Sequence, residues 1–191
     1  MNMSVYQLFT TDVVEYVSDF QNGINTTSPS NLGTKRSTGI EWNGKVSLNK
    51  QITLNGDFNY GYFKRKGNFE STFFDFDADQ FRAKLMTKYK ASKSLDLEIT
   101  VQYLSKTKSL QINSADNLFL DLGVRQKIIR GKGILNLSIR DLFTSNIRET
   151  INIQNYFSTY NYYARGRFVV LGFSYGFGKG EAMEFSGQKR F

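Results

Sequence analysis

Side chains that could perform chemistry are few and lack their usual partners. The 191 residues include no His and no Cys, which excludes zinc knuckles, disulfides, cysteine nucleophiles and histidine-based acid–base catalysis. Asp75, Asp77 and Asp79 alternate as in half of a calcium loop, but no turn glycine and no distal Glu complete the ligand set. The glycine-rich segment Gly176–Gly180 lacks the strand–loop–helix setting of a phosphate loop. We therefore predict no catalytic residue, no metal site and no cofactor, and a protein that is not an enzyme.

A basic cluster lies around one expected turn in a chain whose net charge is +8. As a patch it could bind nucleic acid or lipid phosphate; its members are Lys84, Lys88, Lys90 and Lys93. With a turn near Ala91–Ser92, however, Lys88 falls opposite Asp96 and Met86 opposite Glu98. Opposite charges on neighbouring strands offset one another, and the aromatic residues that would stack on bases occupy the other face. We favour this pairing and predict no nucleic-acid partner.

Tyrosines gather near the end of the chain, where two roles are open to them. They could contact a sugar, a peptide or a siderophore as a candidate extracellular ligand loop, or they could form an interfacial girdle at lipid-headgroup depth; they are Tyr156, Tyr160, Tyr162 and Tyr163. Other aromatic residues are girdle candidates by the same reasoning: Trp42, Tyr60, Tyr62, Tyr175 and Phe177.

The elements that must position these residues are strands. Aromatic residues make up 15% of the chain, proline occurs once, and the mean hydropathy is −0.41 with no long apolar run, so a transmembrane helix is excluded. Period-two alternation over stretches near ten residues predicts strands at 40–48, 54–62, 81–89, 95–103, 118–125, 135–140 and 169–177. An eighth strand is expected from Val5 to Val17, with ambiguous phase.

One face of most of these strands is wholly apolar and the other carries charges. A transmembrane β-strand needs about 9–11 residues of which only every second is apolar, so this pattern fits a membrane barrel. On the apolar face we predict these lipid-facing residues: Leu97, Leu120, Leu137, Leu171 and Phe173. A soluble sheet with one wet face would share the alternation.

Short and long connections alternate along the chain. Tight links are expected at 49–51, 90–94 and 129–133, and long loops at 18–37, 63–79, 104–117 and 143–167. An up-and-down outer-membrane barrel has short periplasmic turns and long extracellular loops, whereas a Greek-key sandwich has no reason to collect its long loops at one end. The fold class we predict is all-β, about eight antiparallel up-and-down strands of a transmembrane β-barrel. Residues 1–177 then form barrel strands and loops, and 178–191 a short periplasmic tail.

The last third of the chain resembles the carboxyl end of TonB-dependent receptor-type barrels, especially the outer membrane protein beta-barrel family of Bacteroidetes. The matching stretches are Leu137–Phe143, read as a penultimate strand, Gly166–Gly178, read as the closing strand, and the tail Lys179–Phe185. Upstream, Asn31–Gly33 followed by Gly39–Glu41 is similar to a loop-to-strand passage of these barrels. The resemblance implies a cell outer-membrane location and partners: membrane lipid, the barrel-assembly machinery, the rest of a receptor barrel with its plug and, indirectly, the TonB system.

Members of that family are several times longer and carry a signal peptide and a plug domain. Met1–Ser4 shows neither the basic nor the apolar region of a signal peptide, and no plug-like segment is visible. We therefore expect the C-terminal part of a receptor-transporter, a partial large barrel that provides membrane wall and extracellular ligand loops. The alternatives are a complete eight-stranded structural barrel, whose lumen side chains would just fill, or a soluble lipid-binding β-barrel.

Overall fold

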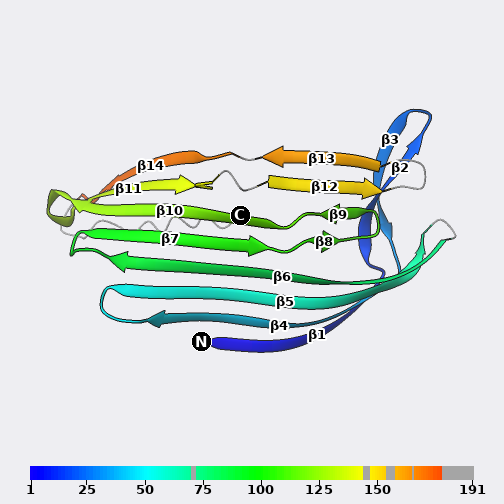
Figure 1. Cartoon of the computed structure of the whole chain (residues 1–191), viewed down its shortest axis with the longest axis horizontal. Helices are drawn as coiled ribbons and strands as arrows, with labels where there is room; N and C mark the ends of the chain where they lie inside the picture. The colour runs from blue at the N-terminus through cyan, green and yellow to red at the C-terminus, as the bar shows by residue number, and fades with distance from the viewer. Residues whose placement is uncertain (70–71, 144–146, 154–157, 165, 178–191) are drawn as a thin grey trace.

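The computed structural model describes residues 1–69, 72–143, 147–153, 158–164 and 166–177. Eight strands form one antiparallel sheet in the order β1-β4-β5-β6-β7-β10-β11-β14, so the chain advances steadily from one edge to the other (Figure 1). This confirms the prediction of eight antiparallel up-and-down strands. Their bounds are β1 Asn2–Thr11, β4 Thr34–Ser47, β5 Ile52–Phe69, β6 Thr72–Lys90, β7 Leu95–Leu104, β10 Asn117–Ile128, β11 Gly133–Arg140 and β14 Phe168–Tyr175.

The two edges of this sheet are β1 and β14. Among the described residues these two strands do not pair with each other, and they lie on opposite sides of the sheet (Figure 1). A closed eight-stranded barrel requires that pairing, because closure leaves no free edge. The sheet in this structure is therefore open, and the closed eight-stranded alternative is not the arrangement that the chain adopts here.

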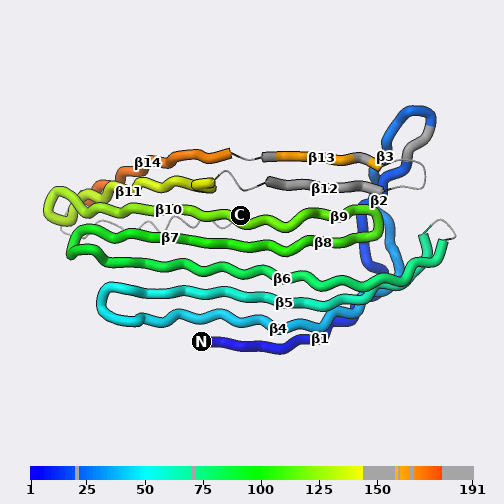
Figure 2. Tube along the Cα trace, in the orientation of Figure 1, coloured from blue at the N-terminus to red at the C-terminus, as the bar shows by residue number. Residues whose placement is uncertain are grey.

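Tight turns join the strands at one end, which we call the tight-turn end (Figure 2). Between β4 and β5, Asn49 Oδ1 accepts hydrogen bonds from Gln51 N at 2.8 Å and Ile52 N at 2.7 Å. Between β6 and β7, Ser92 Oγ accepts from Ser94 N and Leu95 N, both at 3.1 Å. The third turn is a 3-10 turn, η1, at Ile129–Gly131. Side-chain oxygens that bond the backbone of the following residues are a standard way to fix short turns. The three predicted tight links are confirmed.

The four predicted long loops are largely strands, and here the expectation was wrong. Residues 18–37 contain the second half of β2 (Val14–Gln21) and all of β3 (Ile24–Asn31), and β5 and β6 pair as far as Phe69 and Thr72. The other two connections contain β8 (Thr107–Lys108), β9 (Ile112–Ser114), β12 (Ile147–Ile153) and β13 (Ser158–Ala164). A backbone ladder does not require strict alternation of apolar and polar side chains, so period-two hydropathy alone did not reveal these strands. We call this side of the sheet the long-hairpin end.

The predicted first strand, Val5–Val17, is two strands separated by a bend. Asp12 has a φ of 51°, and Gly33, on the returning strand, has a φ of 59°. Beyond these residues, within the part of the chain that the structure describes, β2 and β3 pair only with each other, around a turn in which Asn22 and Gly23 have φ values of 52° and 78°. Asn-Gly favours such a turn, and this signal would have located the hairpin in the sequence. The β2–β3 hairpin runs across the long-hairpin ends of the other strands (Figure 1).

The other extensions continue the main sheet. A four-stranded sheet in the order β13-β12-β9-β8 prolongs the hairpins formed by β7 with β10 and by β11 with β14 (Figure 1). Within the described ranges, no helix has the length and apolarity needed to cross a membrane.

The sheet does not bury its large hydrophobic side chains in a core of its own. The buried hydrophobic residues of the described chain are Val17, Leu32, Phe63 and Ile134. Val17 belongs to the β2–β3 hairpin, and Leu32 lies just after it. A stable sheet normally covers one face with another layer. The uncovered face of this sheet is therefore the first candidate for a functional surface.

Candidate functional site: two faces of the sheet and the folded hairpin

Direct strand pairing places the alternating hydrophobic residues of all eight strands on one face, the apolar face. One row of directly paired residues crosses six strands, through Met3, Trp42, Phe58, Ala83, Tyr103 and Leu118. A second row includes three of the residues predicted to face lipid and consists of Tyr89, Leu97, Val124, Leu137 and Leu171. Leu120 and Phe173 are paired with Val101 and Leu135 on the same face.

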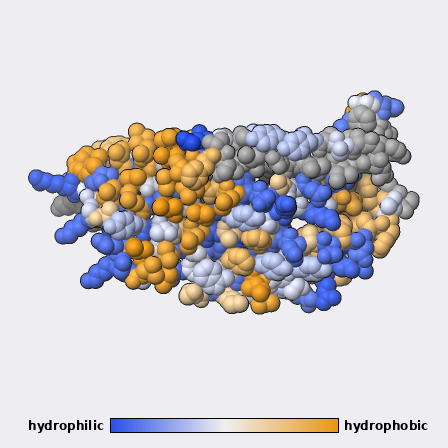
Figure 3. All heavy atoms as spheres, viewed as in Figure 1, coloured by the Kyte–Doolittle hydropathy of each residue, from blue (hydrophilic) through white to orange (hydrophobic). Residues whose placement is uncertain are grey.

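Many of these hydrophobic side chains are exposed. Leu171 is 68% exposed, Phe173 61% and Val169 60%, and Leu137 and Ile99 are also exposed. Hydrophobic residues gather between the hydrophilic side chains of the tight-turn end and the mixed surface toward the long-hairpin end (Figure 3). An uncovered apolar surface of this extent indicates an interaction with lipid or with another protein.

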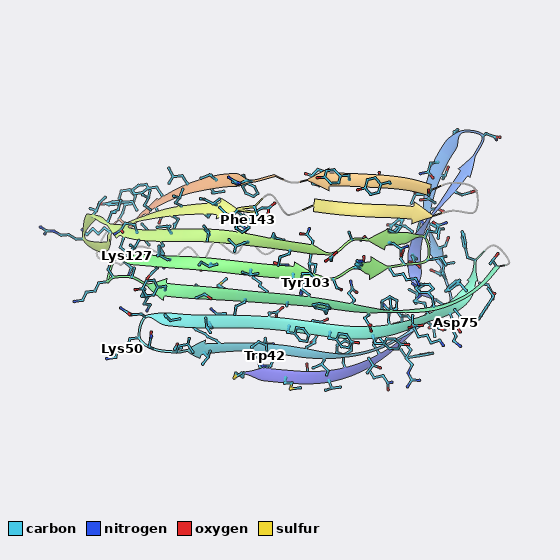
Figure 4. The ribbon with its side chains drawn as sticks, viewed as in Figure 1. Trp42, Lys50, Asp75, Tyr103, Lys127 and Phe143 are labelled. Carbon is cyan, nitrogen blue, oxygen red and sulfur yellow. The ribbon has the colours of Figure 1, made fainter. Side chains whose placement is uncertain are left out.

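Aromatic residues lie at both limits of this apolar band. Toward the long-hairpin end, Tyr60 Oη donates to Asp79 at 2.8 Å and Tyr103 Oη donates to Asp116 at 3.1 Å, so each ring joins an apolar body to a polar partner. At the tight-turn end, the rings of Tyr175 and Phe177 are in edge contact, and their centres are 4.9 Å apart. Lys50 and Lys127 extend from this end, whereas Asp75 lies at the other (Figure 4). The role of these two sets as interfacial girdles stays a prediction.

Trp42 and Tyr62, two further girdle candidates, have different positions. Tyr62 is paired with Thr38 near the limit of the band, since the next residues on that face are charged. Trp42 is two rows further inside, paired with Phe58, and its ring lies against Gly44 and Gly56. Gly44, Gly56 and Trp42 line an apolar depression of about 350 Å³ on this face.

The predicted tyrosine loop is a strand where the structure describes it. Tyr160, Tyr162 and Tyr163 belong to β13 and are exposed by 60%, 57% and 64%. Tyr156 lies outside the described residues. The three described tyrosines are thus available at the long-hairpin end, on paired backbone in place of a loop.

The opposite face, the polar face, carries a ladder of charges. Lys88 Nζ is 3.5 Å from Glu98 Oε2, Arg82 is 3.6 Å from Asp57, and Arg140 is 3.9 Å from Asp121. Lys88, a member of the basic cluster, thus forms an ion pair across strands, but the predicted register was wrong by two residues. Lys88 faces Glu98 and Lys90 faces Asp96, because the turn is centred near residue 93 and not at Ala91–Ser92.

The three aspartates predicted to lie in a solvated loop belong to strand β6. Asp75 forms ion pairs with Lys66 at 3.0 Å and Lys64 at 3.4 Å, side chains of the neighbouring β5. The hydrogen bond from Lys66 is the main cause that lowers the pKa of Asp75 below its usual 3.8. Over the described ranges, no group of three or more His, Cys, Asp or Glu side chains is placed to hold a metal ion.

A further cluster, which sequence reasoning missed, lies where the β2–β3 hairpin folds over the polar face. Arg65 is 5% exposed, and its Nη1 donates to Glu15 Oε2 at 2.9 Å. Glu15 Oε1 accepts from Leu110 N at 3.1 Å, and two hydrogen bonds join the Ser18 backbone to the Gln111 side chain. The hairpin therefore bridges β5 and the β8–β9 turn. No local signal announces a contact between residues 50 positions apart.

Comparison with known proteins gives one family match. The model of the outer membrane protein beta-barrel family matches residues 1–175, which is nearly the whole chain. No curated protein and no solved structure has significant similarity to the chain.

Proposed function

Because the chain belongs to the outer membrane protein beta-barrel family and is a protein of the outer membrane, we propose that it forms the C-terminal wall of a TonB-dependent receptor-type transporter. The apolar face contacts lipid through Leu97, Leu120, Leu137, Leu171 and Phe173, and the polar face lines the interior. The tight-turn end is periplasmic and the long-hairpin end extracellular. The resemblance of the last third of the sequence to such receptors supports this assignment, in which the plug and the TonB system act from outside this segment.

The single observation that carries the proposal is the pair of free edges. The apolar face extends without a break from β1 to β14, yet in the described residues neither edge strand has a partner on its outer side. Unpaired backbone groups cannot face hydrocarbon, because each unsatisfied N–H or C=O there costs several kcal/mol. In our proposal, strands beyond β1 and β14 therefore complete the wall, as they do in a barrel of more than eight strands.

Cysteine cross-linking tests this arrangement, because the chain has no Cys of its own. The chain is folded into detergent micelles with one cysteine in β1 and one in β14, chosen from Met3, Val5, Val169 and Leu171. We expect no intramolecular disulfide and no heat-modifiable gel shift. The control pair Val5→Cys with Ile40→Cys, which are directly opposite in the structure, should cross-link readily. An efficient β1–β14 disulfide together with a gel shift would instead identify a closed eight-stranded structural barrel.

The receptor assignment has a separate test in the native membrane. An antibody raised against the β2–β3 hairpin is used to probe outer-membrane fractions of the source cells. We expect a polypeptide several times larger than the 21.9 kDa of this chain, and mass spectrometry of that band should find plug-domain peptides. A band near the mass of the chain itself would refute the receptor assignment and leave the outer-membrane location intact.

Exposed tyrosines supply the candidate ligand contacts. Tyr160, Tyr162 and Tyr163 lie on β13, at the end of the sheet that this proposal places outside the cell. Exposed rings suit stacking against sugars, peptides or siderophores. Their replacement by alanine should weaken ligand capture by cells without changing the amount of protein in the outer membrane.

A further inference from the structure

Arg65 is a buried cation in an aromatic setting at the long-hairpin end of the polar face. Its guanidinium carbon lies 5.9 Å from the centre of the Phe74 ring. Beside it, Phe63 and Phe76 form an edge contact at 6.4 Å. Two more cations stand over these rings: Lys35 Nζ is 4.6 Å from the Phe63 centre, and Lys108 Nζ is 5.1 Å from the Phe76 centre. The Arg65 site, as we call Lys35, Phe63, Arg65, Phe74, Phe76 and Lys108, combines positive charge with flat apolar surface.

The anion in this site is supplied by the chain itself. Glu15 reaches Arg65 from the β2–β3 hairpin and binds it end-on through one oxygen, while its other oxygen is used by Leu110 N. Arg65 Nη2 donates to Leu32 O at 3.1 Å, but Nε is buried and has no hydrogen-bond partner. A buried donor without an acceptor costs about 1–3 kcal/mol. Glu15 therefore leaves part of the Arg65 fork unsatisfied.

The charge balance of the site also favours an anion beside Arg65 and Lys35, supplied either by Glu15 or by a ligand that takes its place. Burial, together with repulsion from Arg65, lowers the pKa of Lys35, and the attraction of Glu15 only partly opposes this. A carboxylate held by two N–H groups of an Arg is among the strongest ion pairs in proteins. Rings beside such a pair add stacking area for the body of the ligand.

We propose that the Arg65 site binds the carboxylate of an organic acid with an aromatic or ring-shaped body, and that Glu15 is a built-in occupant which such a ligand displaces. Ligand and folded hairpin then exclude each other. Ligand binding releases the β2–β3 hairpin from the polar face, and the folded hairpin keeps the site filled in the absence of ligand.

The hairpin has the construction that such release requires. It has its own ladder, β2 with β3, separate from the main sheet. It joins the sheet through two residues with positive φ, Asp12 and Gly33, and is tied to the polar face by Glu15 and Ser18. A rigid two-stranded unit on two short connections can move as one body when those ties are broken.

Benzoate is the probe, used with the full protein purified from outer membranes in detergent. We expect Glu15→Gln, which keeps the shape of the side chain but removes its charge, to bind benzoate at least tenfold more tightly than the wild type in calorimetry. In the wild type, Glu15 occupies the site in most molecules, and the apparent affinity for benzoate falls in proportion to the fraction of molecules whose site is free. Adding Arg65→Gln to this variant should abolish benzoate binding. Benzamide, which lacks the carboxylate, should bind neither the wild type nor Glu15→Gln.

Hydrogen–deuterium exchange gives an independent readout. Benzoate should raise the exchange of peptides covering residues 14–31 in the wild type, and the Glu15→Gln variant should show raised exchange without benzoate. Peptides of β7 and β10 serve as the control for intact folding. Equal benzoate affinity in wild type and Glu15→Gln, or binding that survives Arg65→Gln, would overturn the proposal. Both results are read at this site, so they do not depend on whether the barrel is a receptor.

Discussion

The indole ring of Trp42 lies against Gly56 of the neighbouring strand, in the space that any larger residue would need. Trp42 is the only Trp in the chain, so its fluorescence reports on the apolar face alone. If this face contacts lipid, the emission of the folded protein should be blue-shifted and should be quenched by lipids brominated in their acyl chains. Unchanged emission with brominated lipids would place this face outside the bilayer.

Replacing that glycine should disturb the same contact. In Gly56→Val the new side chain overlaps the ring, so we expect a loss of about 1–3 kcal/mol in folding free energy, with red-shifted emission. Gly172→Val is the matched control, because a Cβ at Gly172 meets its nearest neighbour, Asn136, at an ordinary 3.8 Å. Denaturant titration in lipid vesicles measures both variants. Equal losses would show that the Trp42 contact is not what makes Gly56 necessary.

Charge should be tolerated on one face and not on the other. Leu120→Arg on the apolar face is expected to cost about 2–4 kcal/mol near the bilayer midplane and less toward the girdles. Thr100→Arg should cost much less, because Thr100 is paired with Asp121 on the polar face and the new guanidinium gains a carboxylate partner. Folding into vesicles is measured for both, and for Arg at Val169, Leu171, Phe173 and Tyr175 along β14. A flat profile along β14 would contradict a membrane-facing strand.

The register between β6 and β7 can be read from one ion pair. Lys88 and Glu98 are about half exposed, so their coupling should be small, about 0.2–1 kcal/mol. A double-mutant cycle with Lys88→Ala and Glu98→Ala measures it. The parallel cycle for Lys88 with Asp96, the pair expected from sequence, should give a smaller coupling energy. The reverse order would restore the sequence-based register.

Substitution of Gly33 should lower the folding free energy more than substitution of Gly23, the glycine in the turn between β2 and β3. A Cβ at Gly33 would collide with the Lys66 carbonyl, and its φ is already positive. Gly33→Ala should therefore cost well over 1 kcal/mol and detach the β2–β3 hairpin. Gly23→Ala has a positive φ but open space around it, so it should cost about 1 kcal/mol. Exchange of the residue 14–31 peptides compares them, and similar rates would show that the bend does not depend on Gly33.

Asp75 should titrate at an unusually low pH. Its folded-state pKa is lowered chiefly by the Lys66 hydrogen bond, so the stabilisation is fully present above the usual 3.8 and is lost as the pH falls through the folded value. NMR titration of the Asp75 carboxyl should show a pKa below 3.8 in the wild type. Lys66→Gln should raise it toward 3.8 by more than Lys64→Gln does, since Lys66 is the closer partner. If both variants raised the pKa equally, the shift would come from the summed positive charge near Asp75 and not from the Lys66 hydrogen bond.

Period-two alternation was sufficient to predict the strands that form the apolar band. Leu97, Leu137 and Leu171 were assigned to one face from sequence, and direct pairing places them in one row. Side chains alternate strictly along a strand, so a hydrophobic face is visible in the sequence before any partner is known. The tight turns could be predicted for the same reason, because the residues that favour a short turn lie within the turn itself.

The tertiary structure decided what depends on partners distant in the chain. Whether the sheet closes is set by the pairing of β1 and β14, and no residue pattern within either strand encodes its neighbour. The Lys88–Glu98 register depended on the centre of one turn, where an error of a single residue shifts every pair by two. The contact of Glu15 with Arg65 exists because two residues with positive φ turn a hairpin back over the polar face, and hydropathy records neither bend direction nor long-range charge pairing.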